Sequence, residues 1–178
     1  GDGFLAMSNL LDKSLVRELR FEIEEFHTDY CSVLDNGALD EWVDFFSEDA
    51  LYRITARENA DAGLRAGLVY AEGRNMIKDR AFSILNTQMF APRYIQIFTS
   101  NVKVLEVIGM NDGVLGEGLI KSKTNYLLLQ TLVDGPTTLH QSGRYYDTFS
   151  RKNDQLLIQE RQCIYDSTLI ANDLVYPV

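Results

Sequence analysis

The sequence predicts a single α+β domain in which helices come first and antiparallel strands follow. Its 178 residues are a usual length for one domain. Up to about residue 88 the apolar residues recur at helical spacing, whereas beyond Pro92 they form extended runs separated by turn signals. No repeat or linker divides the chain, and hydrophobic (46%) and charged (24%) residues occur in the proportions of a globular protein.

The first predicted helix covers about residues 12–34. Its apolar residues share one face, and its acidic residues lie on the other, so the helix is half-buried. The apolar set is Leu15, Leu19, Ile23, Phe26, Tyr30 and Val33, and the acidic set is Glu18, Glu22, Glu25 and Asp29. Asn36-Gly37 is expected to end this helix, because both residues tolerate the left-handed cap.

A second, shorter helix is predicted from Leu39, Trp42, Val43 and Phe46, which fall at i, i+3, i+4 and i+7 and would end at residues 47–49. Residues 50–56 are predicted to form a strand, and 57–73 a loop with one helical turn. A third helix is predicted over about 74–88, where Ile77, Ala81, Ile84 and Leu85 share one face.

Four long strands are predicted after Pro92, over residues 93–108, 115–133, 138–151 and 156–166. The turn signals between them are Asn111-Asp112-Gly113, Asp134-Gly135-Pro136 and Asn153-Asp154. Three helices packed in a strongly curved, mixed and mainly antiparallel sheet make the NTF2-like cone. We expect residues 1–178 to form this one domain, with 1–7 as disordered or upstream residues.

Charge and composition exclude several classes of partner. The net charge of −9 argues against nucleic acid or an anionic membrane, since both need a basic face. No apolar run reaches the roughly 18 residues of a membrane span, and the start of the chain lacks the basic region of a signal peptide. We therefore expect a cytoplasmic protein. Cys31 and Cys163, which are far apart in the sequence, are expected to be buried free thiols.

The residues that are missing restrict the chemistry. The chain has two histidines, His27 and His140. A Rieske cluster needs two Cys and two His in paired motifs, and a mononuclear iron site needs two His and a carboxylate. Dinucleotide, P-loop and nucleophile-elbow motifs are also absent from the sequence. We therefore expect no catalytic, cofactor-binding or metal-binding residue in this chain.

A cavity inside the cone remains possible, with His27 as its most reactive residue. His27 could pair with Asp29 or Asp44 as acid and base, although a helix histidine bonded to a nearby carboxylate is the simpler interpretation. Tyrosines in strands are usually half-buried packing residues, and His140 is expected to face solvent. The candidate cavity residues are His27, Tyr30, Asp44, Tyr52 and Tyr126.

The end of the sequence is too apolar for a free terminus. Leu174, Val175, Tyr176 and Val178 fall within five residues, and exposing them together would leave an apolar patch. Pro177 cannot donate to a sheet ladder, which suits an edge or a groove. We expect this segment to pack against another subunit or against the sheet edge, and these four residues to serve assembly.

Several phrases together resemble the small (β) subunit of bacterial aromatic-ring-hydroxylating dioxygenases, the Rieske non-haem iron oxygenases. They are Leu34-Asp35 followed by Asp40-Glu41-Trp42, Phe46, Asp49 and Tyr52-Arg53, then Tyr70-Ala71-Glu72-Gly73-Arg74 with Asp79-Arg80, Thr99-Ser100-Asn101-Val102, and Arg161-Gln162-Cys163-Ile164-Tyr165-Asp166. Arg53-Ile54-Thr55 and the ending after Asp166 look most like the salicylate-hydroxylase and terephthalate-dioxygenase branch. Gln96-Ile97 and Gly73 differ from the polar residues that many relatives carry at these positions.

The resemblance implies an NTF2-like fold and a hexamer of three α and three β subunits. In such complexes the α subunit holds the Rieske [2Fe-2S] cluster, the mononuclear Fe(II) and the aromatic-acid pocket, and a reductase, sometimes with a ferredoxin, supplies electrons from NAD(P)H. The β subunit would then be structural and would bind α. We expect it to trimerise through its sheet, because Glu18, Glu22 and Glu25 make the first helix a poor interface core. The alternatives are a stand-alone NTF2-like isomerase or dehydratase, or a small-ligand binding module.

Overall fold

The computed structural model of the chain describes residues 13–63, 69–87, 93–109, 118–166 and 178. Helices α2 (Lys13–Asp35) and α3 (Leu39–Trp42) and the 3-10 turn η1 (Val43–Phe45) precede the first strand. Helix α5 (Arg74–Thr87) lies between the second and third strands. A fourth, one-turn helix is α4 (Arg57–Asp61). The strands are β1 (Phe46–Ala56), β2 (Val69–Glu72), β3 (Arg93–Ile108), β4 (Leu119–Leu132), β5 (Thr137–Lys152) and β6 (Gln155–Tyr165).

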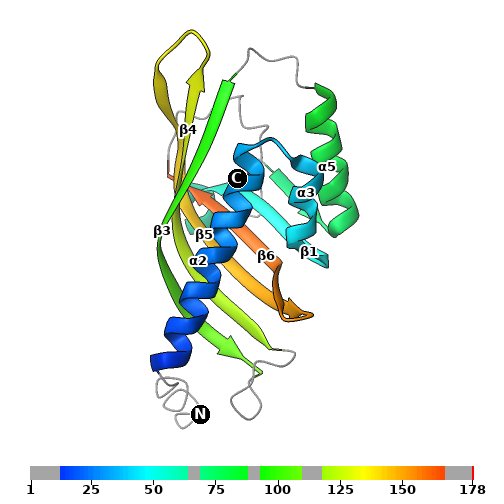
Figure 1. Cartoon of the computed structure of the whole chain (residues 1–178), viewed down its shortest axis with the longest axis vertical. Helices are drawn as coiled ribbons and strands as arrows, with labels where there is room; N and C mark the ends of the chain where they lie inside the picture. Colours follow the sequence, from blue (N-terminus) through cyan, green and yellow to red (C-terminus); the bar gives the residue numbers. More distant parts are fainter. Residues whose placement is uncertain (1–12, 64–68, 88–92, 110–117, 167–177) are drawn as a thin grey trace.

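The six strands form one sheet in the order β2-β1-β6-β5-β4-β3. Strands β3 to β6 are an antiparallel meander, and β1 joins β6 in parallel before pairing with β2 antiparallel. Figure 1 shows the long strands curving behind α2, with β3 on one side of this helix and α3 and α5 on the other. The predicted fold class, a mixed and mainly antiparallel curved sheet holding N-terminal helices, is confirmed.

Helix α2 forms where its apolar periodicity predicts. Its buried residues recur at three- and four-residue intervals and face the sheet, mainly β3. They are Leu19, Ile23, Phe26, His27, Tyr30, Cys31 and Leu34. The helix ends one residue later than predicted, and Gly37 beyond it has a φ of 72°, as the left-handed cap requires.

The second predicted helix is too long. Only one α-turn forms, the 3-10 turn η1 follows it, and strand β1 already begins at Phe46 instead of residue 50. All four apolar residues that suggested the helix are nevertheless buried. A helical turn, a 3-10 turn and the start of a strand follow one another along the same side of the core. The four side chains therefore all face the core, although the backbone conformation changes between them.

The segment predicted as a loop over 57–73 contains more structure than expected. The helical turn is α4, but residues 69–72 form the edge strand β2, which pairs with β1 through Tyr52 and Ala71. Four residues with alternating burial are too few for periodicity to separate from a loop. Gly73 follows with a φ of 86°, and α5 then begins at Arg74 as predicted.

The meander matches the predicted strands to within a few residues at the ends that the structure describes. Asn153 and Asp154 have φ of 52° and 61°, so the β5–β6 hairpin turns on two left-handed residues, as type I′ requires. The turn at Asp134–Pro136 is also present, whereas Asn111-Asp112-Gly113 lies outside the described residues. Asn101 has a φ of 58° at an irregularity that bends β3 in mid-strand.

The core fills the cone between α2, α3 and the concave face of the sheet. Aromatic rings dominate it: Trp42 packs edge-on against Phe46 and Tyr52 at centroid distances of 5.1 and 5.4 Å, and Phe26 packs on Phe149 at 5.0 Å. Cys31 and Cys163 are buried free thiols, as predicted. Burial raises the pKa of Cys31 to about 12, so this thiol stays protonated at neutral pH.

Candidate functional site

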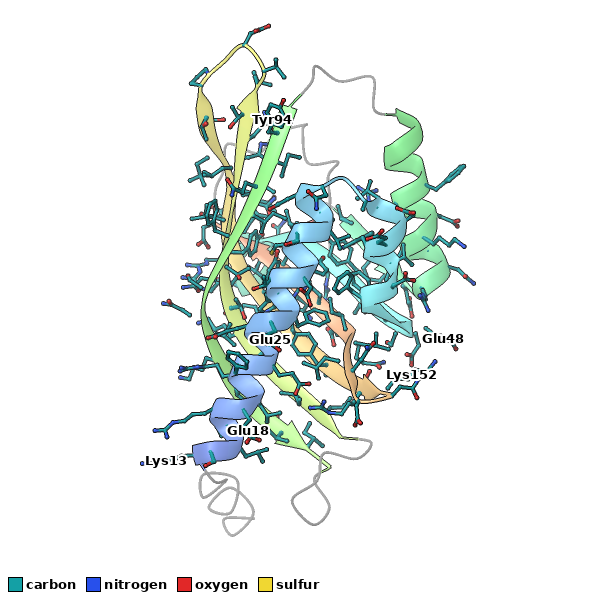
Figure 2. All side chains as sticks on the ribbon, in the orientation of Figure 1. Lys13, Glu18, Glu25, Glu48, Tyr94 and Lys152 are labelled. Atoms are coloured by element: carbon teal, nitrogen blue, oxygen red, sulfur yellow. The ribbon has the colours of Figure 1, made fainter. Side chains whose placement is uncertain are left out.

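The concave face of the sheet carries polar side chains deep inside the cone. They align in cross-strand rows, because directly paired residues of an antiparallel sheet point to the same face. One row is Ser122, Asp147 and Arg161, and the next is Thr124, Tyr145 and Cys163. All six are buried. Figure 2 shows side chains filling the space between α2 and the sheet, where these rows lie.

Arg161 is the centre of this interior. Its Nε and Nη2 donate to the two carboxylate oxygens of Asp147 at 2.8 and 2.9 Å, and neither side chain is exposed. Its guanidinium carbon lies 4.3 Å from the centroid of the Tyr30 ring and 3.8 Å from that of Tyr145. A bidentate pair with two aromatic faces is the arrangement in which a buried guanidinium is best compensated.

Arg161 and Asp147 change each other's pKa in opposite directions. Burial by itself would lower the pKa of Arg161, but Asp147 and the nearby phenols raise it well above its ordinary value. Burial raises the pKa of Asp147, and the charge and hydrogen bonds of Arg161 oppose that rise. Arg161 therefore favours the carboxylate form of Asp147, to which it donates two hydrogen bonds.

His27 is bound on both ring nitrogens. Its Nδ1 lies 3.1 Å from Arg161 Nη2, and its Nε2 lies 3.0 Å from Thr124 Oγ1. Because a guanidinium only donates, Nδ1 must accept, and the ring proton must be on Nε2 and donate to Thr124. Burial, and then the Arg161 charge, lower the pKa of His27 well below the ordinary histidine value of 6.5. His27 is therefore a neutral histidine with no lone pair available for a proton.

Val178 lies inside the cone. It is fully buried, and its carbonyl oxygen accepts hydrogen bonds from the phenols of Tyr30 at 2.8 Å and Tyr52 at 3.0 Å. Its N–H donates to Tyr52 Oη at 3.0 Å. Trp42 Nε1 donates to Tyr30 Oη at 2.9 Å, so the Tyr30 hydroxyl is fixed from both sides.

The structure brings together four of the five candidate cavity residues. His27, Tyr30, Tyr52 and Tyr126 are buried in the cone; Tyr126 stacks on Tyr145 at 4.4 Å and bonds to Gln141. Asp44 does not join them: its side chain is 73% exposed and pairs with Arg74 on the surface. The suggested acid–base pair of His27 with Asp29 or Asp44 is therefore wrong, because both carboxylates point outward from their helical turns.

Sequence reasoning missed Asp147, Arg161 and the place of Val178. Asp147 had a signal, since it alternates with the inward-facing Tyr145 and Phe149. Arg161 had no such signal. Leu156 and Ile158 of β6 face inward, and an irregularity after Ile158 shifts the alternation by one residue. Arg161 and Cys163 therefore face inward. Strict period-two counting would place Arg161 outside. Of the assembly residues, Leu174, Val175 and Tyr176 lie outside the described residues, and Val178 is in this chain's own core rather than at a sheet edge.

A shallow groove of about 430 Å³ lies outside the cone, between α2, η1 and the β5–β6 turn. Acidic side chains surround an apolar floor, and Arg151 pairs with Glu22 at 2.7 Å on its rim. Within the described residues, no three His, Cys, Asp or Glu side chains are arranged to hold a metal ion. None of the described helices has the length and apolarity to cross a membrane.

Comparison with known proteins gives consistent results. The family described as "Ring hydroxylating beta subunit" matches residues 31–172. The small subunit of anthranilate 1,2-dioxygenase from Burkholderia cepacia is 32% identical over 89% of this chain and 93% of its own length. A terephthalate 1,2-dioxygenase terminal oxygenase subunit beta 2 from Comamonas is 27% identical over 88% and 97%.

Solved structures agree. A structure described as the beta subunit of an aromatic-ring-hydroxylating dioxygenase from Novosphingobium aromaticivorans superposes with a TM-score of 0.79 at 27% identity, covering 92% of this chain and 99% of that one. The beta subunit of benzoate 1,2-dioxygenase from Burkholderia mallei has a TM-score of 0.67 at 16% identity over 87% and 95%, which supports the fold alone. With a family match over most of its length and a relative above 30% identity, this chain belongs to the ring-hydroxylating dioxygenase β-subunit family.

Proposed function

We propose that this chain is the structural β subunit of an α3β3 oxygenase that hydroxylates an aromatic carboxylic acid in aromatic catabolism. The observation that carries the proposal is the family match over residues 31–172. The named relatives are small subunits of anthranilate and terephthalate dioxygenases, and both of those substrates are aromatic acids. In this proposal the α subunit holds the Rieske [2Fe-2S] cluster, the mononuclear Fe(II) and the substrate pocket.

We further propose that the chain supplies no catalytic group. What supports this is the state of the polar residues inside the cone. His27 uses its only lone pair to accept from Arg161, and a general base needs that lone pair for the substrate proton. The two carboxylate oxygens of Asp147 accept hydrogen bonds from Nε and Nη2 of Arg161. The hydroxyl groups of Tyr30 and Tyr52 both donate to the carbonyl oxygen of Val178. A stand-alone isomerase or dehydratase would need these groups free.

The outer face of the sheet is the proposed assembly surface. Strand β3 is at the end of the sheet, and α2 covers its inner face. Its outer face exposes Tyr94, Phe98, Leu105 and Ile108. Figure 2 shows Tyr94 on β3 near the β4–β5 hairpin, where Leu132, Val133 and Leu139 are also exposed. Aromatic and apolar side chains are enriched at interface cores, and charged ones such as those along α2 are depleted there.

Co-expression with a Rieske-type α subunit tests the proposal. The chain, carrying an affinity tag, should retain α at a one-to-one ratio. The purified complex should oxidise an aromatic acid when O₂, NAD(P)H and a reductase are supplied. In the cell we expect the complex in the cytoplasm, where NAD(P)H is available. Elemental analysis should find iron only in preparations that contain α. Stoichiometric iron in the isolated chain, or turnover of an aromatic acid without α, would contradict the proposal.

The His27→Gln variant is the matched test of the non-catalytic role. Gln keeps one acceptor for Arg161 and one donor for Thr124 but cannot act as a base. The assembled complex should keep its kcat to within a few-fold, because a true general base contributes about 10²–10⁴ in rate. A hundredfold loss of kcat in a complex with normal subunit ratio and iron content would favour the isomerase-like alternative.

A further inference from the structure

The position of Val178 defines a receptor within the cone. Two phenol hydroxyls, from α2 and β1, converge on one oxygen: Tyr30 Oη and Tyr52 Oη lie 2.8 and 3.0 Å from the carbonyl oxygen of Val178. A carbonyl oxygen only accepts, so both phenols donate to it. Burial is the main cause that raises the pKa of both phenols, so both keep the proton that they donate. Two aligned donors on one buried oxygen form a specific acceptor site rather than a chance contact.

The surrounding protein holds these donors in place without Val178. Trp42 Nε1 donates to Tyr30 Oη at 2.9 Å, which orients the phenol proton toward the centre of the cone. The Trp42 and Tyr52 rings pack edge-on at 5.4 Å, and Tyr30 packs on Phe45 at 5.4 Å. Each of these rings belongs to α2, α3, η1 or β1, so the receptor is built from regular elements.

The side chain of the occupant belongs to the buried hydrophobic core. Val178 is fully buried, and Cys163 Sγ lies 3.9 Å from its carbonyl oxygen. An isopropyl group beside a carbonyl oxygen is therefore the shape and chemistry that the site recognises.

We propose that the cone contains a binding site for small branched acyl compounds, carboxylic acids or their amides, and that Val178 occupies this site as an internal ligand. The Tyr30 and Tyr52 hydroxyls bind the acyl oxygen, and the buried hydrophobic core to which Val178 belongs takes the branched alkyl group. The site is closed to free ligand while Val178 is present. Removing Val178 opens it.

The test uses the chain shortened by one residue and the fluorescence of Trp42. Trp42 is the single tryptophan of the sequence, so its emission reports on this site alone. Removing Val178 should shift the emission to longer wavelength as water enters beside Tyr30. Isovaleramide and isovalerate, which reproduce the isopropyl and acyl groups of Val178, should reverse the shift. A dissociation constant on the order of millimolar is expected for so small a ligand. The amide and the acid compared side by side distinguish a neutral from an anionic ligand.

Point variants in the shortened chain supply the controls. Tyr30→Phe and Tyr52→Phe each keep the ring and remove one donor, and each should weaken binding by about tenfold. Tyr94→Phe changes an exposed ring on β3 and should leave binding unchanged. The full-length chain should show no response at the same ligand concentrations.

Three results would overturn the proposal: equal binding by the full-length chain, no binding of either ligand by a folded shortened chain, or equal binding by the Tyr30→Phe and Tyr94→Phe variants. If the shortened chain does not fold, Val178→Gly replaces it. Glycine keeps the main-chain carbonyl of residue 178 but lacks the isopropyl group. Both ligands should therefore displace this glycine and shift the Trp42 emission, whereas the wild-type chain should not respond. A folded Val178→Gly variant without any response would equally refute the site.

Discussion

At the scale of single residues, Arg161 determines how the interior of the cone is arranged. One guanidinium bonds to Asp147, donates to His27, and packs on the rings of Tyr30 and Tyr145. The desolvation of two buried charges offsets much of their mutual attraction, so the intact pair adds little net stability. Its effect is on specificity: one arrangement lets Arg161 bond to both Asp147 and His27, while its Nη1 has no hydrogen-bond partner among the described residues. Removing Asp147 would leave a buried charge without compensation.

Replacing Asp147 by Asn should therefore destabilise the chain strongly. Arg161 would keep its charge in a fully buried position, and breaking a buried pair in this way typically costs about 3–5 kcal/mol of unfolding free energy. Asp44→Asn is the matched control, since it breaks the Arg74 pair at a site that is 73% exposed and should cost less than about 1 kcal/mol. Urea unfolding of both variants measures the difference, and equal losses would show that burial of the Asp147 pair has no special weight.

The protonation of His27 should make stability depend on pH. The folded chain holds this ring neutral, whereas the unfolded chain binds a proton below a pKa near 6.5. Because the unfolded state then binds more protons, the free energy of unfolding decreases as the pH falls, by up to about 1.4 kcal/mol per unit below 6.5. Asp147 and Arg161, which form a hydrogen-bonded pair, are the charged groups that face the ring. His27→Gln lacks the titration, so the wild type should lose about 1.4 kcal/mol relative to it between pH 7.5 and 5.5. Parallel stability curves would refute the assignment.

At the scale of elements, the sequence predicts an element well where one signal extends over many residues. Helix α2 and the meander strands follow from long apolar patterns and from turns such as Asn153-Asp154. Strand β2 was not predicted, because its four residues are too few to show a pattern. The start of β1 at Phe46 was not predicted, because a helix and a strand would bury the same side chains there. The Arg161 side chain faces inward because of an irregularity in β6, and the local sequence does not predict this irregularity. His27 and Tyr30 on α2, Tyr52 on β1 and Tyr126 on β4 could therefore be predicted as site residues. Arg161 could not, because its inward direction depends on that irregularity.

Gly143 is the position where the sheet itself limits substitution. It is buried in β5 between Tyr126 and Tyr165, and a Cβ there would meet the Ile164 carbonyl oxygen and lie 2.7 Å from Tyr165 Cα. Gly143→Ala should cost about 1–3 kcal/mol, because backbone of β6 must move to make room. Gly135→Ala is the control: its Cβ would approach only the flexible Leu132 side chain, at 3.2 Å, and should cost less than about 1 kcal/mol. Thermal unfolding of the two variants decides, and equal melting temperatures would contradict the predicted clash.

At the scale of the whole molecule, the two sides of the cone differ in what they expose. The helix side presents Glu18 and Glu25 together with the acidic groove. The outer sheet face presents apolar side chains along β3 and at the β4–β5 hairpin. A sheet edge that exposes aromatic residues invites association, and a monomer would normally protect it with charges. The proposed trimer and the contact with α therefore belong on the sheet side.

A pair of matched variants tests this placement. Phe98 is 45% exposed on β3, and Phe21 is 62% exposed on α2, so the same change to Lys can be made on either side of the cone. Phe98→Lys puts a charge into the proposed interface and should weaken assembly by at least about 2 kcal/mol, or roughly thirtyfold in the dissociation constant. Phe21→Lys should leave assembly unchanged, because solvent can accommodate a charge on the helix face. Both variants should keep the wild-type melting temperature as isolated chains. Light scattering of each variant co-expressed with α measures the assembly: a full hexamer with Phe98→Lys, or dissociation with Phe21→Lys, would move the interface to the helix side.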